Sequence, residues 1–89
     1  MLHTASRYGH LNIVEYLLDL GQPADINTPN KYGWTALHVA SFRGHVGVAR
    51  LLLDRGADKT VKDDQGKTPF DRAKRCGHGK IMELLNDAP

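Results

Sequence analysis

The sequence predicts an all-α solenoid, in which similar pairs of antiparallel helices stack side by side. A pattern that begins Leu-His-Thr-Ala-Ser at residues 2–10 returns as Leu-His-Val-Ala-Ser at residues 37–45, and more loosely at residues 70–78. Its Gly-His dipeptide starts at positions 9, 44 and 77, so the intervals are 35 and 33 residues. A repeat of this length is typical of stacked supersecondary units. Such a stack offers an extended surface to a partner and seldom gathers catalytic groups in one pocket.

A tight turn is predicted at the start of the second and third units. Residues 30–33 and 63–66 have Asn or Asp first and Gly fourth, which is the preference of a type I turn. Thr35 and Thr68 follow and suit the N-cap of a short helix. Pro69 is tolerated at the first helical position, because its missing N–H would be unpaired there in any residue.

The short helix of each unit is followed by a second helix. Leu37 and Ala40 lie on one face of the short helix, and Gly44 ends it where the chain must turn left-handed. Gly21 and Gly56 are predicted to end the first two of the second helices. The apolar residues of these second helices follow helical spacing at 13–18, 48–52 and 81–85.

The composition is that of a small folded protein. The chain has 89 residues, of which 40% are hydrophobic and 25% charged. Its only cysteine, Cys76, has no intramolecular partner and fits a reducing compartment. No apolar run approaches the roughly 20 residues that span a bilayer. We therefore expect an intracellular protein without a membrane partner, located in the cytoplasm, with the nucleus as an alternative.

Two segments resemble the ankyrin signature T-P-L-H-x-A. They are Thr-Ala-Leu-His-Val-Ala at residues 35–40 and Thr-Pro-Phe-Asp-Arg-Ala at residues 68–73. Gly-His at 44–45, three leucines at 51–53 and Gly-Ala-Asp at 56–58 extend the resemblance over a full 33-residue unit. The resemblance covers essentially the whole chain. It implies an ankyrin-repeat solenoid, whose helix pairs are joined by projecting β-turn or hairpin loops and stack into a slightly curved array.

We expect one ankyrin-repeat domain over residues 1–89. It divides approximately into a truncated repeat at 1–29, a complete repeat at 30–62 and a C-terminal capping repeat at 63–89. The first unit lacks its turn and its Thr-Pro, so the inner face of its helices has no neighbour. We therefore expect marginal stability, or self-association through this uncapped N-terminal repeat.

The residues that could carry chemistry have structural explanations. The five histidines occupy two recurring repeat positions, so we expect them to bond backbone between helices and turns and not to form a zinc site. Nothing in the sequence orients Cys76 and His78 as a nucleophile and base. Residues 77–80 lack the first Gly and the Ser or Thr of a phosphate-binding loop. We predict no catalytic residue, metal or cofactor, and no enzyme.

The family resemblance implies that a partner meets the turn tips and the exposed side of the short helices. Aromatic and arginine side chains, which are enriched at interface hot spots, gather at these positions. Trp34 follows a turn glycine, so we expect its side chain to point away from the stacked helices. Packing between units is the alternative for Trp34 and Phe42. The predicted partner-binding residues are Arg7, Tyr8, Lys31, Tyr32, Trp34, Phe42, Arg43, Asp64, Gln65, Lys67 and Arg75.

Two functions are compatible with the sequence. The first is a non-enzymatic protein–protein interaction module, forming the C-terminal part of an ankyrin array in a larger intracellular scaffold or regulatory protein. The second is binding of nucleic acid or another polyanion, because residues 59–80 hold seven Lys and Arg against three Asp. The net charge of +2 over the whole chain is too small to indicate nucleic-acid binding by itself. The basic residues of the second are Lys62, Lys67, Arg72, Lys74, Arg75 and Lys80.

Overall fold

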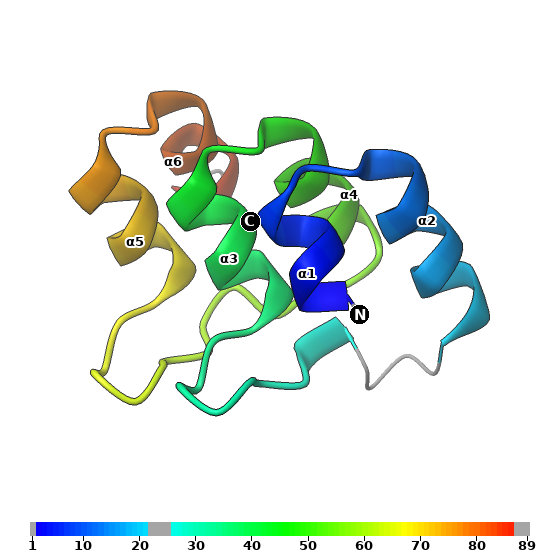
Figure 1. Cartoon of the computed structure of the whole chain (residues 1–89). Helices are drawn as coiled ribbons and strands as arrows, with labels where there is room; N and C mark the ends of the chain where they lie inside the picture. The colour runs from blue at the N-terminus through cyan, green and yellow to red at the C-terminus, as the bar shows by residue number, and fades with distance from the viewer. Residues whose placement is uncertain (1, 22–25, 87–89) are drawn as a thin grey trace.

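The computed structural model describes residues 2–21 and 26–86, and helices are its only regular elements in those ranges (Figure 1). The short helices α1, α3 and α5 lie side by side in one layer, and α2, α4 and α6 form the second layer (Figure 1). The predicted all-α solenoid of stacked helix pairs is confirmed. The helices are α1 (Leu2–Arg7), α2 (Leu11–Leu20), α3 (Ala36–Arg43), α4 (Val46–Asp54), α5 (Pro69–Cys76) and α6 (Gly79–Asn86).

Both predicted turns are present. In each, the N–H of the fourth residue, a glycine with φ near +77°, donates to the carbonyl of the first residue, at 3.0 Å in residues 30–33 and 2.9 Å in residues 63–66. The side chain of the first residue closes the same turn. Oδ1 of Asn30 and Oδ1 of Asp63 each accept two further backbone N–H groups.

Thr35 and Thr68 cap α3 and α5, as predicted. Each threonine Oγ1 accepts the N–H of the third helical residue, and the side chain of that residue accepts the threonine N–H. This reciprocal capping box satisfies two backbone donors that a helix start leaves unpaired. His38 fills the third position in α3 and Asp71 fills it in α5. The exchange of histidine for aspartate between units therefore keeps the helix start intact.

Histidine rings join each unit to its neighbour. The Nε2–H of His45 donates to the Arg7 carbonyl at 2.9 Å, and that of His78 donates to the Phe42 carbonyl at 3.0 Å. The signature histidines make a second, parallel series of bonds. Their Nε2–H groups donate to the carbonyl just before the capping threonine of the next unit, at 3.0 Å for His3 and 2.9 Å for His38. The expected structural role of these histidines is confirmed.

The glycines before these histidines are required for two reasons. Gly9 and Gly44 have φ values of +71° and +78°, in the left-handed region that suits glycine. A Cβ at either position would also lie 2.7 Å from the histidine ring of the next unit, which is too close for contact. Gly77 has a similar φ of +74° but nothing within 4 Å of an added Cβ.

The second helices end in two ways. After α4, the Gly56 N–H donates to the Leu53 carbonyl and the Ala57 N–H donates to the Leu52 carbonyl, with φ of +91° at Gly56. This is a Schellman motif, and it confirms the prediction for Gly56. Gly21 follows the last residue of α2, as predicted, but its φ of −81° is extended.

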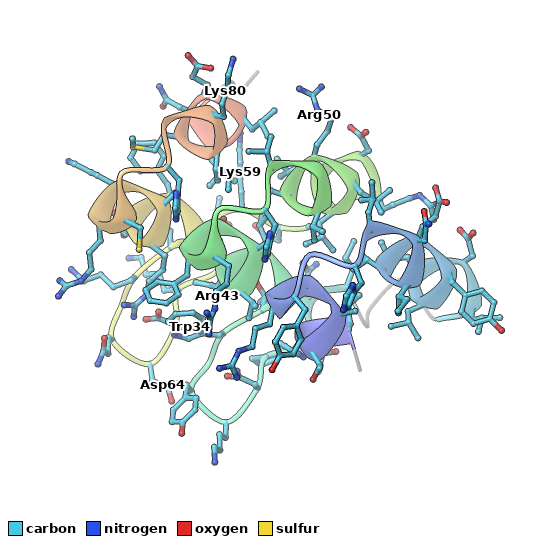
Figure 2. All side chains as sticks on the ribbon, turned by 45° about the horizontal axis from the view of Figure 1, so that its top comes forward. Trp34, Arg43, Arg50, Lys59, Asp64 and Lys80 are labelled. Carbon is cyan, nitrogen blue, oxygen red and sulfur yellow. The ribbon has the colours of Figure 1, made fainter. Side chains whose placement is uncertain are left out.

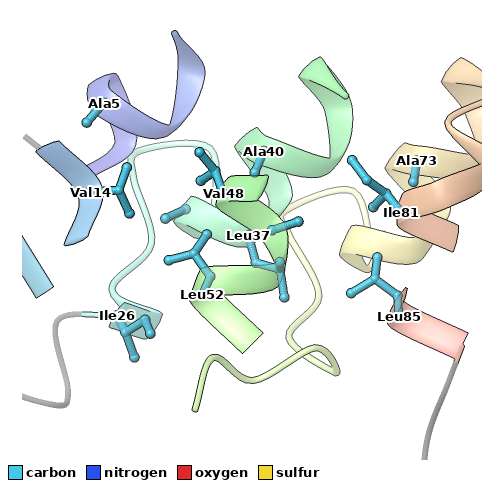
Figure 3. Packing of buried hydrophobic residues seen from close by; sticks show 12 residues of the cluster. Ala5, Val14, Ile26, Leu37, Ala40, Val48, Leu52, Ala73, Ile81 and Leu85 are labelled. Atoms are coloured by element: carbon cyan, nitrogen blue, oxygen red, sulfur yellow. The ribbon is translucent and has the colours of Figure 1, made fainter. Parts of the chain in front are cut away.

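One hydrophobic core runs through all three helix pairs (Figure 3). Leu37 and Leu52 of the middle pair are fully buried. The alanines at one repeat position, Ala5, Ala40 and Ala73, are buried as well, and their small side chains let neighbouring short helices approach closely. The outer surface of α2 has no such cover. Ile13, Tyr16 and Leu20 are exposed there, and Leu11, also exposed, lies beside Gly47 of α4.

Gly44→Ala should destabilise the protein more than Gly77→Ala, by about 1 kcal/mol or more. Both changes place Ala in the left-handed region, which costs about 1–2 kcal/mol. Only Gly44→Ala also displaces the His78 ring and breaks its bond to the Phe42 carbonyl. Chemical unfolding of both variants measures the difference.

The control is the same pair of changes in a His78→Ala background. There the additional cost of Gly44→Ala should disappear, because no ring remains to be displaced. Equal costs for the two glycines in the wild-type background would contradict this account of the Gly-His contact.

Candidate functional site

A groove of about 610 Å³ opens where the short helices meet the turns. Trp34, Arg43 and Asp64 lie on this side of the molecule, whereas Arg50 and Lys80 lie on the opposite side, over α4 and α6 (Figure 2). Residues from all three units contribute to the groove. The lining residues are His3, Thr4, Arg7, Asn30, Tyr32, Trp34, Val39, Phe42, Arg43, Asp64, Gln65 and Arg72.

The groove brings together most of the residues predicted from the sequence. Those that line it are Arg7, Tyr32, Trp34, Phe42, Arg43, Asp64 and Gln65. The others, Tyr8, Lys31, Lys67 and Arg75, are exposed and lie outside it. Sequence reasoning missed His3, Thr4, Asn30, Val39 and Arg72. Arg72 was assigned to the basic patch. His3 and Asn30 stand at positions with a structural role in the repeat, and Thr4 and Val39 stand at the x position of the signature.

Trp34 forms the floor of the groove, and its direction differs from the prediction. The indole is partly buried and meets the Phe42 ring edge to face, with 5.3 Å between centroids. The guanidinium carbon of Arg72 lies 4.8 Å from the indole centroid. The expectation that this side chain points away from the stacked helices is therefore wrong. Phe42 of α3 and Arg72 of α5 flank the ring, and both contacts are favourable.

Arg72 is held in place by a buried carboxylate. The Asp63 side chain is fully buried and accepts from Arg72 Nε at 2.9 Å and from Nη2 at 2.5 Å. Burial alone would raise the pKa of Asp63, but backbone N–H donors from its own turn and the guanidinium outweigh burial and lower the pKa. Arg72 is thus neutralised by Asp63 while it supports the Trp34 ring.

Two other guanidinium groups of the groove have no such partner. Arg7 and Arg43 are exposed in the last turns of α1 and α3, and neither guanidinium forms a hydrogen bond or ion pair with any residue that the structure describes. The Arg7 guanidinium lies 5.7 Å from the Tyr8 ring centroid. On the turn side, the Asp64 N–H donates to the Tyr32 carbonyl at 3.1 Å and ties the two turns together.

His38 is fully buried next to Trp34, with 6.1 Å between the two ring centroids. Its Nδ1 accepts the Thr35 N–H at 3.1 Å, and its Nε2–H donates to the Lys67 carbonyl at 2.9 Å. Both contacts require the neutral ring with its proton on Nε2. Burial is the largest influence on this ring and lowers the pKa of His38.

The basic residues of the third unit do not gather on one face. Arg72 is paired with Asp63 inside the groove, while Lys80 lies on the opposite side (Figure 2). Over residues 2–21 and 26–86, no group of three or more His, Cys, Asp or Glu side chains could hold a metal ion. None of the helices in those ranges has the length and apolar character needed to cross a membrane.

Stacked helix pairs, projecting turns and a groove along the short helices define a helical repeat protein of the solenoid type. The family model for ankyrin repeats (3 copies) matches residues 2–88, so the chain belongs to the ankyrin repeat family. Ankyrin repeats are typical protein-interaction modules.

Curated relatives share this region. ARF GTPase-activating protein GIT2 of Mus musculus is 44% identical over 84 residues, which is 94% of this chain and 12% of the relative. Human SH3 and multiple ankyrin repeat domains protein 2 is 37% identical over 97% of this chain and 4% of its own length. Glycerophosphocholine phosphodiesterase GDE1 of Candida albicans is 33% identical over 94% of this chain and 7% of its own length. The chain therefore spans about an eighth or less of these relatives.

Acidification below about pH 6.5 should destabilise the protein through His38. The unfolded ring takes up a proton near its ordinary pKa, whereas the folded ring, whose pKa is lowered, does not. The unfolded state then binds more protons than the folded state. The free energy of unfolding therefore falls by up to about 1.4 kcal/mol for each pH unit of acidification, until the pH passes the pKa of His38 in the folded protein.

Urea unfolding of the wild type and of His38→Gln across this pH range tests the assignment. Glutamine preserves a capping box and does not titrate. The variant should therefore show a shallower pH dependence above the range in which carboxylates titrate. Identical slopes for the two chains would assign the pH dependence to other groups.

Proposed function

We propose that the chain is a non-enzymatic protein–protein interaction module that binds a segment of another protein in the groove. The observation that carries this proposal is the Trp34–Phe42 pair, which is partly buried and held from one side by Arg72. A rigid aromatic floor loses little conformational freedom on binding, so more of its contact energy appears as affinity. Exposed aromatic and arginine groups around such a floor are the groups enriched at interface hot spots.

The setting of the module is also a proposal. Relatives that share this region are several times longer, so we propose that it works within a larger intracellular scaffold or regulatory protein, in the cytoplasm or in the nucleus. We keep the division into one domain of three repeats, at 1–29, 30–62 and 63–89. The polyanion alternative has no support in the relatives, and the separation of Lys80 from the groove also counts against it.

A second proposal, self-association, rests on the exposed apolar surface of α2. Ile13, Tyr16 and Leu20 are 47–65% exposed and, at spacings of three and four residues, lie on one face of the helix. Contiguous apolar surface of this kind is a common site of protein association. A second copy of the chain could cover it.

Removing aromatic groups from the groove should weaken partner binding. Tyr32→Ala changes an exposed tyrosine at the groove rim, and Tyr16→Ala changes an equally exposed tyrosine on α2 as a matched control. Proteins captured from a cell extract by the immobilised wild-type chain should be lost with Tyr32→Ala and Trp34→Ala and retained with Tyr16→Ala. Trp34→Ala should cost at least about 2 kcal/mol of affinity.

Because Trp34 also packs between units, its removal should cost the fold about 2 kcal/mol, which thermal unfolding of the same variant measures. Tyr32→Ala should leave the melting temperature nearly unchanged, so its effect on binding is free of this complication. The interface would lie elsewhere if Tyr32→Ala still captured the partner proteins and if the amount captured by Trp34→Ala only followed its folded fraction.

Self-association through α2 should depend on Tyr16 and not on Tyr32. In sedimentation equilibrium, the average mass of the wild type should rise with concentration, because exposed apolar side chains gain by mutual burial. Tyr16→Lys should return the protein to a monomer, and Tyr32→Lys should behave as the wild type. A wild-type monomer at every concentration, including about 1 mM, would remove this proposal.

A further inference from the structure

The groove distributes its charge unevenly. Arg7 and Arg43 project from the ends of α1 and α3, and Asp64 belongs to the turns. Arg72 adds little net charge, because the buried Asp63 carboxylate neutralises it. The groove therefore presents two cations without partners along the short helices and one carboxylate on the turn side.

A guanidinium favours a planar anion. It offers parallel N–H donors that match the two oxygens of a carboxylate, and it binds such a group in a bidentate manner. The guanidinium groups of Arg7 and Arg43 are free to do so, since neither group forms an ion pair or hydrogen bond with any residue that the structure describes. A basic segment would place like charges beside both groups. The charge thus favours an acidic occupant.

The floor between these charges is apolar. Val39 is 8% exposed, and the Trp34 and Phe42 rings pack against each other beside it. One large apolar side chain of an occupant can contact this floor and lose water on both surfaces. An apolar floor beside charged walls favours an occupant that carries both an apolar side chain and charged side chains.

The length of the groove indicates an extended chain. Its lining runs from His3 of α1 to Arg72 of α5, across two contacts between neighbouring short helices. Packed helices lie about 8–10 Å apart, so the groove is roughly 20 Å long. An extended polypeptide advances about 3.3 Å per residue, and about six residues therefore fill it.

We propose that the groove binds an extended acidic segment of a partner protein, about six residues long. Its carboxylates pair with Arg7 and Arg43, and one of its large apolar side chains lies on Trp34 and Phe42. The inference rests on the proposed function, because it specifies the partner of the same groove.

A random library of 12-residue peptides displayed on phage tests the proposal on the intact chain. Peptides selected by the wild type should be enriched in Asp and Glu near one Trp, Phe, Tyr or Leu. Their dissociation constants should rise by about tenfold or more when Arg7→Glu and Arg43→Glu are combined, since two attractive pairs become repulsive. The same doubly substituted chain should select peptides enriched in Lys and Arg.

Arg50→Glu is the matched control, because Arg50 is an exposed arginine on the opposite side of the molecule (Figure 2). It should change the dissociation constants by less than about twofold. Thermal unfolding should be similar for all three chains, since the substituted side chains are exposed. Arg43→Lys keeps the charge and should fall between the wild type and Arg43→Glu.

The outcomes separate the inference from the proposed function. Selected peptides that lose binding with Tyr32→Ala but show no excess of Asp and Glu, or no response to charge reversal, would overturn the acidic occupant and leave the groove as the interface. Peptides that bind Tyr32→Ala and Trp34→Ala as tightly as the wild type would overturn both. A library that yields no specific binder would also overturn both.

Discussion

The stack depends on histidine side chains that donate to backbone carbonyls of the adjacent unit. Two parallel series exist, one from the signature position, represented by His38, and one from the Gly-His position, represented by His45. Each bond fixes the position of one unit against the next, and Gly9 and Gly44 let the Gly-His ring of the following unit approach. The buried core supplies most of the stabilisation but has little directionality. The histidine bonds therefore set the register in which the core packs.

The groove inherits its geometry from this register. The carbonyl of Trp34 accepts from His3 in the first unit, and its ring lies against Arg72 of the third unit. Asp63 fixes Arg72 from beneath. A floor assembled in this way is already ordered in the free protein, which under the proposed function reduces the entropic cost of association. The two unpaired guanidinium groups lie outside this network and remain available for a ligand.

Local features of the fold followed from the sequence, because they depend on residues within four positions of each other. The turn at 30–33, the Thr35 cap and the left-handed Gly44 are of this kind. The direction of the Trp34 side chain was predicted wrongly, because it depends on Arg72, which lies 38 residues further along the chain. The basic character assigned to Arg72 was misleading for a similar reason. The sequence shows that Arg72 is positively charged, but only the fold shows that the buried Asp63 carboxylate neutralises this charge.

The double role of Trp34 limits how this surface can change during evolution. A substitution there alters the floor of the groove, and the same residue lies between the first and third units. The Arg43 side chain has no such double role, because it is exposed and its guanidinium forms no hydrogen bond or ion pair with a described residue. Selection for a new partner can therefore act freely on the charged rim, whereas the aromatic floor changes only together with the stack. Divergence among descendants of this protein should be concentrated at the rim.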